Sequence, residues 1–242
     1  MSPTQSSSQR RSAARTVVVW EALRDVLGDK IASVVDIGGG TGGFAVRVAE
    51  LGHQITVIDP SPDALAALSR RADESGVADR VVGQQGDLGN LLDLVPAGSA
   101  DVVLCHGVLE IVDDPAAALA TIAATLRPGG ALSLLVAQRH ATVVARAMAG
   151  HFGQAMALLD NPTAGATGRR FTADEVSTIL DEAGFETTAV HAVRVFADLV
   201  PSSLVDLEPG AATALVELEQ AVADRPEYLA LATQIHTVAT RR

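Results

Sequence analysis

Hydrophobic residues along the chain follow two patterns, short apolar runs and longer stretches with helical spacing. From about residue 13 to residue 137 the two kinds of segment alternate. The short runs predict strands at "IASVVDI", "QITVID", "RVVGQQ", "ADVVLCH" and "GALSLLVA". Because they are nearly continuous in Val, Ile and Leu and are separated by helical stretches, they predict a parallel sheet covered by helices on both faces.

Several local signals mark where the predicted helices begin and end. A first helix is expected around Ala13 to Leu27. Ser61 is a typical helix N-cap, and Pro62 suits the first helical position. The segment "RPGG" predicts a turn before the fifth strand.

The pattern changes in the second half of the chain. From about His140 to Arg170 it is helical and irregular, which predicts an insertion that is a lid, a substrate platform or a structural cover. A capped helix "TADEVSTILDEAG", a strand "FETTAVHAVRVF", a helix to Ala223 and a last strand "TQIHTVATR" follow. The expected fold is therefore α/β and doubly wound, with a mostly parallel Rossmann-like sheet, an antiparallel C-terminal edge hairpin and a helical insertion around residues 140–170.

Length and composition agree with one large domain. The 242 residues are 48% hydrophobic and 19% charged, which is enough for a sizeable core. We expect residues 1–12 to form a disordered polar tail and residues 13–242 to form a single domain. No apolar run reaches the roughly 18 residues that span a bilayer, and the polar N-terminus lacks the apolar region of a signal peptide. With Cys105 as the only cysteine, a cytoplasmic protein without a disulfide is expected.

The segment "VVDIGGGTGGF" carries the strongest chemical signal. It contains G-x-G-x-x-G at Gly38, Gly40 and Gly43, which is typical of a dinucleotide loop. Asp36, however, ends the preceding strand, where a carboxylate would repel a pyrophosphate. The same carboxylate would favour the sulfonium and ammonium groups of S-adenosylmethionine.

Two further strand ends fit this cofactor. Asp59 ends the second strand and suits a ribose diol in either cofactor. Asp87, in "QQGD", suits a group that reaches an adenine amine. S-adenosylmethionine, with S-adenosylhomocysteine as the product, is therefore favoured. A nicotinamide dinucleotide, or a loop that serves only as a tight turn, remain the alternatives.

The segments "VVDIGGGTGG", "VIDPS", "GD" and "LRPGG", in this order, resemble class I S-adenosylmethionine-dependent methyltransferases over roughly residues 30–137. The segments "CHGVLEIVDDP" and "MAGHFGQAM", with the C-terminal region, are similar to bacterial tRNA 5-carboxymethoxyuridine methyltransferases, which esterify the carboxylate of a wobble uridine. The resemblance implies these cofactor contacts: Arg15, Gly38, Gly39, Asp59, Gln85, Gly86 and His106. The chemistry of the loops adds Asp36, Gly40 and Asp87.

The acceptor decides which residues would be catalytic. A carboxylate acceptor needs no general base, only a guanidinium that holds it in line with the methyl group. Arg194, Arg169 and Arg170 are the candidates for this clamp. A hydroxyl or amine acceptor would need a base within hydrogen-bond reach, for which Glu110 and His106 are the candidates.

Charge leaves two classes of acceptor open. The net charge is 18 − 29 = −11, which disfavours steering toward nucleic acid. The basic run that follows the insertion in the tRNA-modifying family is reduced here to Arg169 and Arg170. The acceptor is therefore either tRNA or a small-molecule acid, hydroxyl or amine, and a cofactor-binding protein without catalysis is a third hypothesis. His140, His151 and His191 have no metal-ligand spacing with any Cys or Asp pair, so no metal is expected. A homodimer would use the edge hairpin or the insertion.

Overall fold

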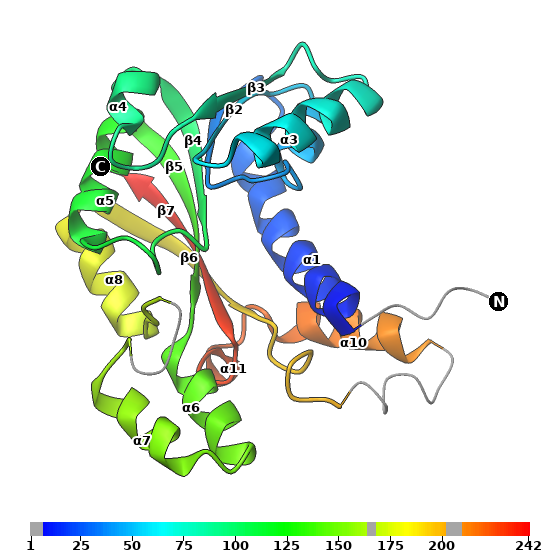
Figure 1. Ribbon diagram of the computed structural model, residues 1–242, viewed down its shortest axis with the longest axis vertical. Coiled ribbons are helices and arrows are strands. Elements are labelled where there is room, and N and C mark those ends of the chain that lie inside the picture. Colours follow the sequence, from blue (N-terminus) through cyan, green and yellow to red (C-terminus); the bar gives the residue numbers. More distant parts are fainter. Residues whose placement is uncertain (1–6, 164–167, 202–209) are drawn as a thin grey trace. The chain divides into compact units, whose positions relative to one another are not determined.

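The computed structural model describes residues 7–163, 168–201 and 210–242, and these residues contain a seven-stranded sheet (Figure 1). The strand order is β3-β2-β1-β4-β5-β7-β6. The strands are β1 (Ser33–Ile37), β2 (Gln54–Asp59), β3 (Val81–Gln85), β4 (Ala100–His106), β5 (Leu126–Ala137), β6 (Phe185–Val193) and β7 (Gln234–Arg241).

Helices separate most of the strands in the chain. They are α1 (Ser7–Leu27), α2 (Ala45–Glu50), α3 (Pro62–Glu74), α4 (Leu91–Leu94), α5 (Pro115–Thr125), α6 (Arg139–Met148), α7 (Phe152–Asp160), α8 (Ala173–Glu182), α10 (Ala211–Val222) and α11 (Pro226–Leu229). Ser61 caps α3 by accepting a hydrogen bond from the Ala64 N–H, as predicted.

The first five strands form a parallel sheet. In this sheet β1 pairs with β2 and β4, β2 with β3, and β4 with β5. The register places Ile37 beside Ile58 and Cys105, and Asp59 beside Gln85. The carboxyl ends of β1, β2, β3 and β4 therefore meet at one edge, where a doubly wound sheet binds its ligands.

The last two strands form the predicted antiparallel edge hairpin. The Arg242 N–H donates to the Gly184 carbonyl, the Thr188 hydroxyl donates to the Val238 carbonyl, and the His191 ring contacts the His236 ring. In these three pairs the residue number increases along β6 while it decreases along β7, so the two strands run antiparallel. The mostly parallel α/β fold expected from the sequence is confirmed.

The described residues group into two compact units. The first contains the described residues up to Leu23 together with Val136–Glu175 and Val190–His236, and the second contains Arg24–Leu135, Val176–Ala189 and Thr237–Arg242. Strands β5, β6 and β7 contribute residues to both units. The single domain expected over residues 13–242 stays a prediction.

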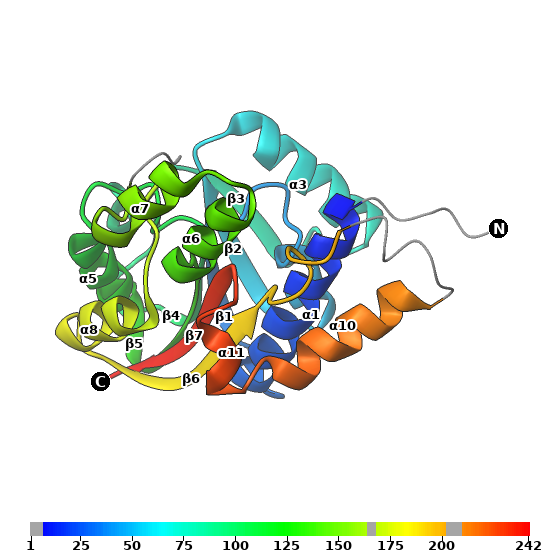
Figure 2. The ribbon, with the colours of Figure 1, turned by 90° about the horizontal axis from the view of Figure 1, so that it is seen from below.

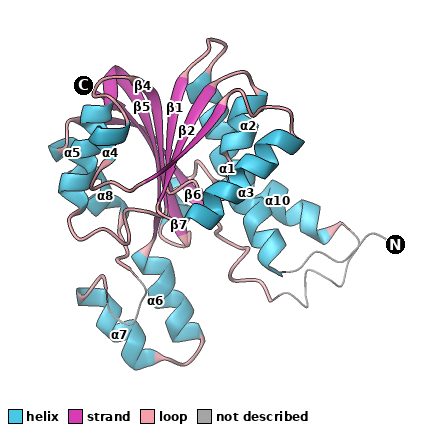
Figure 3. Ribbon diagram, turned by 45° about the horizontal axis from the view of Figure 1, so that its top comes forward, coloured by secondary structure: helices cyan, strands magenta, loops and turns pink. Residues whose placement is uncertain are grey.

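Within the first unit, α1 and α10 lie side by side (Figure 2), and the Gln220 side-chain amide donates a hydrogen bond of 2.6 Å to the Glu21 carboxylate. Helices α6 and α7 pack against each other (Figure 3). They begin where the insertion around residues 140–170 was expected, so its helical character is confirmed.

The structure differs from the sequence-based expectation at the start of the chain. Helix α1 begins at Ser7 rather than near Ala13, so the part of the predicted disordered tail from residue 7 onward is helical instead. No glycine or proline interrupts this polar segment, and polar residues can continue a helix without an apolar face. Residues 1–6 lie outside the described part of the chain.

A second difference concerns the predicted "RPGG" turn, which lies inside β5 as a bulge. Ala100 pairs with Leu126 and Val102 with Ala131, so residues 127–130 all lie opposite Asp101. A Cβ atom on Gly130 would lie 2.9 Å from the Arg127 carbonyl oxygen and 3.1 Å from that of Asp101. The glycine is needed because two backbone segments approach closely there.

Candidate cofactor and acceptor sites

The glycine-rich loop follows β1 and turns sharply over the end of β2. The Gly38 N–H donates a hydrogen bond of 2.8 Å to the Ile58 carbonyl. Gly38 has a φ of 69°, and a Cβ atom there would lie 2.5 Å from Cγ2 of Val108. Only glycine can adopt this left-handed backbone and leave room for Val108. No side chain therefore covers the loop backbone at this position.

Asp36 lies beneath this loop. Its side chain is 3% exposed, and a Cβ atom on Gly39 would lie 2.4 Å from Oδ2 of Asp36. Gly39 is therefore a glycine because the carboxylate occupies the space of a side chain. Asp36 is not among the residues that line the cavity described below, so it would act on a cofactor through its charge.

Asp59 ties the glycine loop to the start of α3. Its Oδ2 accepts a hydrogen bond of 2.9 Å from the Gly40 N–H, and its Oδ1 accepts one of 2.9 Å from the Ser61 N–H. A carboxylate oxygen can accept two hydrogen bonds. Each oxygen thus keeps acceptor capacity for the ribose hydroxyls that the sequence assigned to this residue.

The loop after β3 is fixed by its own side chains. The Gln85 side-chain amide donates to the Pro60 carbonyl at 3.2 Å, and Oδ1 of Asp87 accepts from the Gly89 N–H at 2.7 Å. A Cβ atom on Gly86 would lie 2.4 Å from Cδ1 of Leu94. Gln85 thus joins the second and third loops, which is a structural role at this site.

These loops surround a cavity of about 550 Å³ in the second unit, within the size range of small-molecule sites. Gly38, Gly86 and Asp87, three of the residues that the sequence assigned to the cofactor, line it, and their cofactor contacts stay predictions. Asp36, Gly39, Gly40, Asp59, Gln85 and His106 are not among its lining residues; Gly40 and Asp59 are hydrogen-bonded to each other in the loop beside it. Arg15 belongs to the first unit, so its cofactor contact stays a prediction.

Apolar residues that sequence reasoning had not selected complete the cavity wall. The lining includes Pro60, Leu88, Val108 and Ile111. Ile111 is 72% exposed, so this part of the cavity wall is apolar and open to solvent. The segment "GVLEIV" contained this signal, since all four of its apolar residues follow the strand end rather than lie within the strand.

His106 lies at the end of β4, and the carboxylates of Asp36 and Glu110 interact electrostatically with the neighbouring Cys105. Nε2 of His106 lies 2.9 Å from the Ser133 hydroxyl, and the ring packs edge-on against Phe44 with centroids 5.2 Å apart. Burial, together with the negative charges of Glu110 and Asp36, raises the pKa of the Cys105 thiol to about 12. Cys105 is thus an inert buried thiol, and two carboxylates place negative charge near the strand ends, where a sulfonium would be stabilised.

Comparison with known proteins identifies the family. A family model described as a methyltransferase domain matches residues 8–190. The tRNA 5-carboxymethoxyuridine methyltransferase of Escherichia coli is 30% identical over 235 residues, covering 94% of this chain and 88% of that protein. The chain belongs to the class I S-adenosylmethionine-dependent methyltransferases. This methyltransferase uses S-adenosylmethionine as its cofactor, and the nicotinamide alternative is excluded.

This methyltransferase is also similar to one further curated protein and to one solved structure. A ubiquinone biosynthesis O-methyltransferase of Xanthomonas axonopodis is 38% identical over 120 residues, which cover 49% of this chain and 48% of that protein. The solved structure of an S-adenosylmethionine-dependent methyltransferase from Mesorhizobium loti superimposes with a TM-score of 0.61 at 21% identity, covering 93% of this chain and 98% of that one. The latter similarity shows the shared fold.

The predicted acceptor residues of the methyltransferase lie on both units. Glu110 follows β4 in the second unit, whereas Arg194, Arg169 and Arg170 belong to the first. Nη2 of Arg194 lies 2.7 Å from Oδ1 and 2.6 Å from Oδ2 of Asp198. The guanidinium therefore already holds one carboxylate, and the catalytic roles of Arg194 and Glu110 stay predictions.

The described part of this methyltransferase contains neither a membrane-spanning helix nor a group of side chains that could bind a metal ion. Over those residues, no helix is both long and apolar enough to cross a bilayer. In the same residues, no three His, Cys, Asp or Glu side chains are grouped so that they could hold a metal ion.

Proposed function

We propose that this methyltransferase transfers a methyl group from S-adenosylmethionine to the carboxylate of 5-carboxymethoxyuridine at a tRNA wobble position. The observation that carries the proposal is the similarity to the E. coli tRNA 5-carboxymethoxyuridine methyltransferase, which extends over nearly the whole chain. It thus includes the insertion and the C-terminal half, where acceptor recognition is expected, as well as the cofactor loops that many methyltransferases share.

The chemistry of a carboxylate acceptor suits the residues present. Transfer from a sulfonium to a carboxylate is an in-line displacement in which opposite charges cancel, so positioning and exclusion of water supply most of the catalysis. No proton must leave the acceptor, and no base is needed. A guanidinium such as that of Arg194 would hold the carboxylate through charge-assisted hydrogen bonding.

The insertion supports an RNA acceptor because it differs in charge from the rest of the chain. Residues 139–170 contain four arginines and one aspartate, within a chain of net charge −11. Arg139 is paired with Glu175 at 2.8 Å, and Arg146, Arg169 and Arg170 are the remaining arginines. A locally basic segment on an acidic protein favours a polyanionic partner.

The same insertion exposes a stripe of apolar side chains. Phe152, Met156 and Leu159 recur at helical spacing on α7, and Phe152 is 71% exposed and Met156 67% exposed. Unstacked bases bind to such aromatic and apolar side chains, while arginines bind the phosphates between them. The stripe, defined here as Phe152, Met156 and Leu159, therefore supports recognition of a single-stranded RNA loop.

A small-molecule acceptor is the second candidate function. It is favoured by the net charge of −11 and by the similarity of about half the chain to a ubiquinone biosynthesis O-methyltransferase. An acceptor hydroxyl would need a base, for which Glu110 after β4 is the candidate.

The deciding experiment uses S-adenosylmethionine with a deuterated methyl group. The protein is incubated with bulk tRNA from cells that lack the gene and, separately, with the small-molecule fraction of the same cells. Mass spectrometry of nucleosides and metabolites then locates the label. Label on the ester of 5-carboxymethoxyuridine is the expected result, whereas label only in a small molecule would establish the second candidate.

A further inference from the structure

The loop that follows β6 holds Arg194 in an unusual backbone conformation. Arg194 has a φ of 61° and is the only non-glycine residue among those described with a positive φ. A long side chain adopts the left-handed region at an energetic cost, so surrounding contacts must fix it. Such local strain often occurs where a side chain is held for function.

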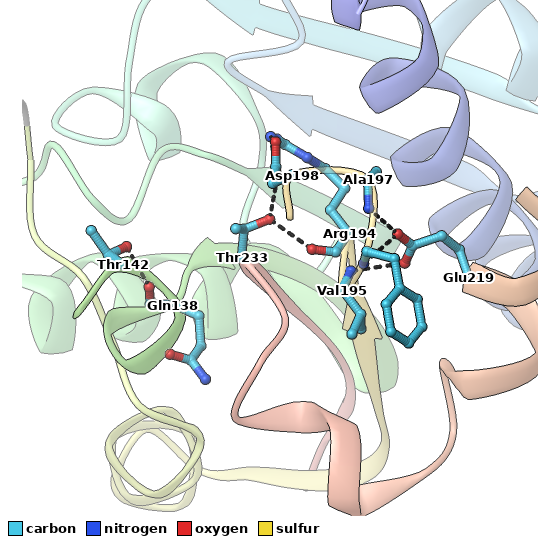
Figure 4. A network of polar contacts seen from close by, with 9 residues as sticks. Gln138, Thr142, Arg194, Val195, Ala197, Asp198, Glu219 and Thr233 are labelled. Carbon is cyan, nitrogen blue, oxygen red and sulfur yellow. Dashed lines mark hydrogen bonds and ion pairs between the residues drawn. The ribbon is translucent and has the colours of Figure 1, made fainter. Parts of the chain in front are cut away.

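Glu219 supplies the first of these contacts. This residue of α10 is fully buried, and its carboxylate accepts hydrogen bonds from three successive backbone N–H groups (Figure 4). Oε2 accepts from Val195 at 2.8 Å, and Oε1 accepts from Phe196 at 2.8 Å and from Ala197 at 2.7 Å. These are the three residues directly after Arg194, so the carboxylate fixes the backbone that immediately follows the strained residue.

Thr233 supplies the second contact from the other side of the loop. Its N–H and its hydroxyl lie 3.2 Å and 3.0 Å from the Arg194 carbonyl oxygen, and the hydroxyl lies 2.7 Å from Oδ2 of Asp198. The hydroxyl has one proton and can donate to only one of these oxygens at a time. Thr233 thus bridges the backbone of Arg194 and the carboxylate that pairs with its guanidinium.

The Arg194 guanidinium keeps an unused donor. Its side chain is 24% exposed and that of Asp198 is 17% exposed, and Asp198 engages Nη2. Nε of Arg194 is buried and has no hydrogen-bond partner among the described residues. A buried donor without an acceptor is costly, which adds to the energetic cost of this conformation; a second carboxylate could reach the guanidinium only at the exposed part of the side chain.

We infer that Glu219 is a positioning residue for the methyl acceptor: by accepting hydrogen bonds from the N–H groups of residues 195–197 it holds Arg194 in its left-handed conformation, so that the partly exposed guanidinium can hold the acceptor carboxylate. This inference rests on the proposed function, because it assumes that the acceptor carries a carboxylate. Glu219 itself does not touch the acceptor. Its effect passes through Arg194.

The test compares Glu219→Gln with Glu217→Gln, which removes an exposed carboxylate from the same helix. In Glu219→Gln the amide oxygen can keep the bonds to Phe196 and Ala197, while the amide NH₂ faces the Val195 N–H and breaks the bond nearest to Arg194. We expect the KM for tRNA containing 5-carboxymethoxyuridine to rise about tenfold, with unchanged affinity for S-adenosylmethionine by calorimetry. Glu217→Gln should match the wild type.

A double-mutant cycle separates positioning from general stabilisation. If Glu219 acts through Arg194, Glu219→Gln should lower kcat/KM by less than about twofold once Arg194 is already Lys. Additive losses, or a lower melting temperature with unchanged KM, would overturn the inference. An inactive wild type on this tRNA would instead overturn the proposed function, and the inference with it.

Thr233 gives an independent test should Glu219→Gln fail to fold. Thr233→Val removes the hydroxyl with little change in shape, and it should raise the same KM, whereas Thr233→Ser should restore it. A folded Thr233→Val protein with wild-type KM would show that the loop does not position the acceptor.

Discussion

Asp59 joins the backbone of the glycine loop to the start of α3 by accepting two hydrogen bonds. The sequence predicts that its carboxylate also accepts hydrogen bonds from the ribose hydroxyls of the cofactor. Asp59→Ala removes acceptors from two backbone N–H groups and from the ribose hydroxyls. We expect the affinity for S-adenosylmethionine to fall by about 1–3 kcal/mol, measured by calorimetry. Asp73→Ala, at an exposed position of α3, is the matched control. Equal affinities for the two variants would remove Asp59 from the cofactor site.

Gly39 and Gly43 lie in the same loop but differ in the space around them. A Cβ atom on Gly39 would lie 2.4 Å from Oδ2 of Asp36 and 2.9 Å from Cγ1 of Val57, whereas one on Gly43 would meet no atom within 4 Å. Gly39→Ala should therefore destabilise the protein by about 1–3 kcal/mol and weaken cofactor binding, while Gly43→Ala should do neither. Thermal unfolding with and without S-adenosylmethionine checks both. A stable Gly39→Ala protein would mean that Asp36 can move away from the loop.

At the scale of elements, the sequence predicted the order of strands and helices well, because parallel strands have continuous apolar runs and Ser61 with Pro62 is an unambiguous helix start. It failed where the deciding contact is not local. The bulge at "RPGG" depends on how β4 pairs with β5, and the buried contacts of Glu219 depend on a loop more than twenty residues earlier in the chain. Arg194 was identified as a candidate by its charge, but neither its left-handed backbone nor its pairing with Asp198 has a sequence signal.

The apolar stripe on α7 leads to a prediction about RNA binding. The double variant Phe152→Ala and Met156→Ala removes the most exposed side chains of the stripe, and it should weaken binding of tRNA by about 1–3 kcal/mol per lost base contact. Leu218→Ala, at a 45% exposed position on α10, is the control for loss of an exposed apolar side chain. Fluorescence anisotropy with a labelled anticodon stem-loop measures both. A weaker dimer with unchanged RNA affinity would instead identify the stripe as a subunit interface.

For the whole molecule, two electrostatic effects oppose each other when tRNA approaches. The net charge of −11 repels the RNA, whereas the arginines of residues 139–170 attract it locally. Salt screens the long-range repulsion over about 10 Å, but it weakens direct arginine–phosphate contacts by competition from counterions. With Arg146, Arg169 and Arg170 each binding one phosphate, the logarithm of the association constant should fall against the logarithm of salt concentration with a slope of about −2.

That slope can be measured by titrating labelled tRNA between about 50 and 200 mM salt, where the affinity should fall roughly fifteenfold. S-adenosylmethionine provides the internal control, because its binding involves no polyanion and should change little over the same range. Replacing Arg169 by Gln should reduce the slope, whereas replacing Arg225, an exposed arginine outside the insertion, should not. An affinity that rises with salt would mean that repulsion by the acidic surface dominates and that the insertion does not bind RNA. The small-molecule acceptor would then be the better explanation for the basic insertion, with its arginines binding an acidic metabolite.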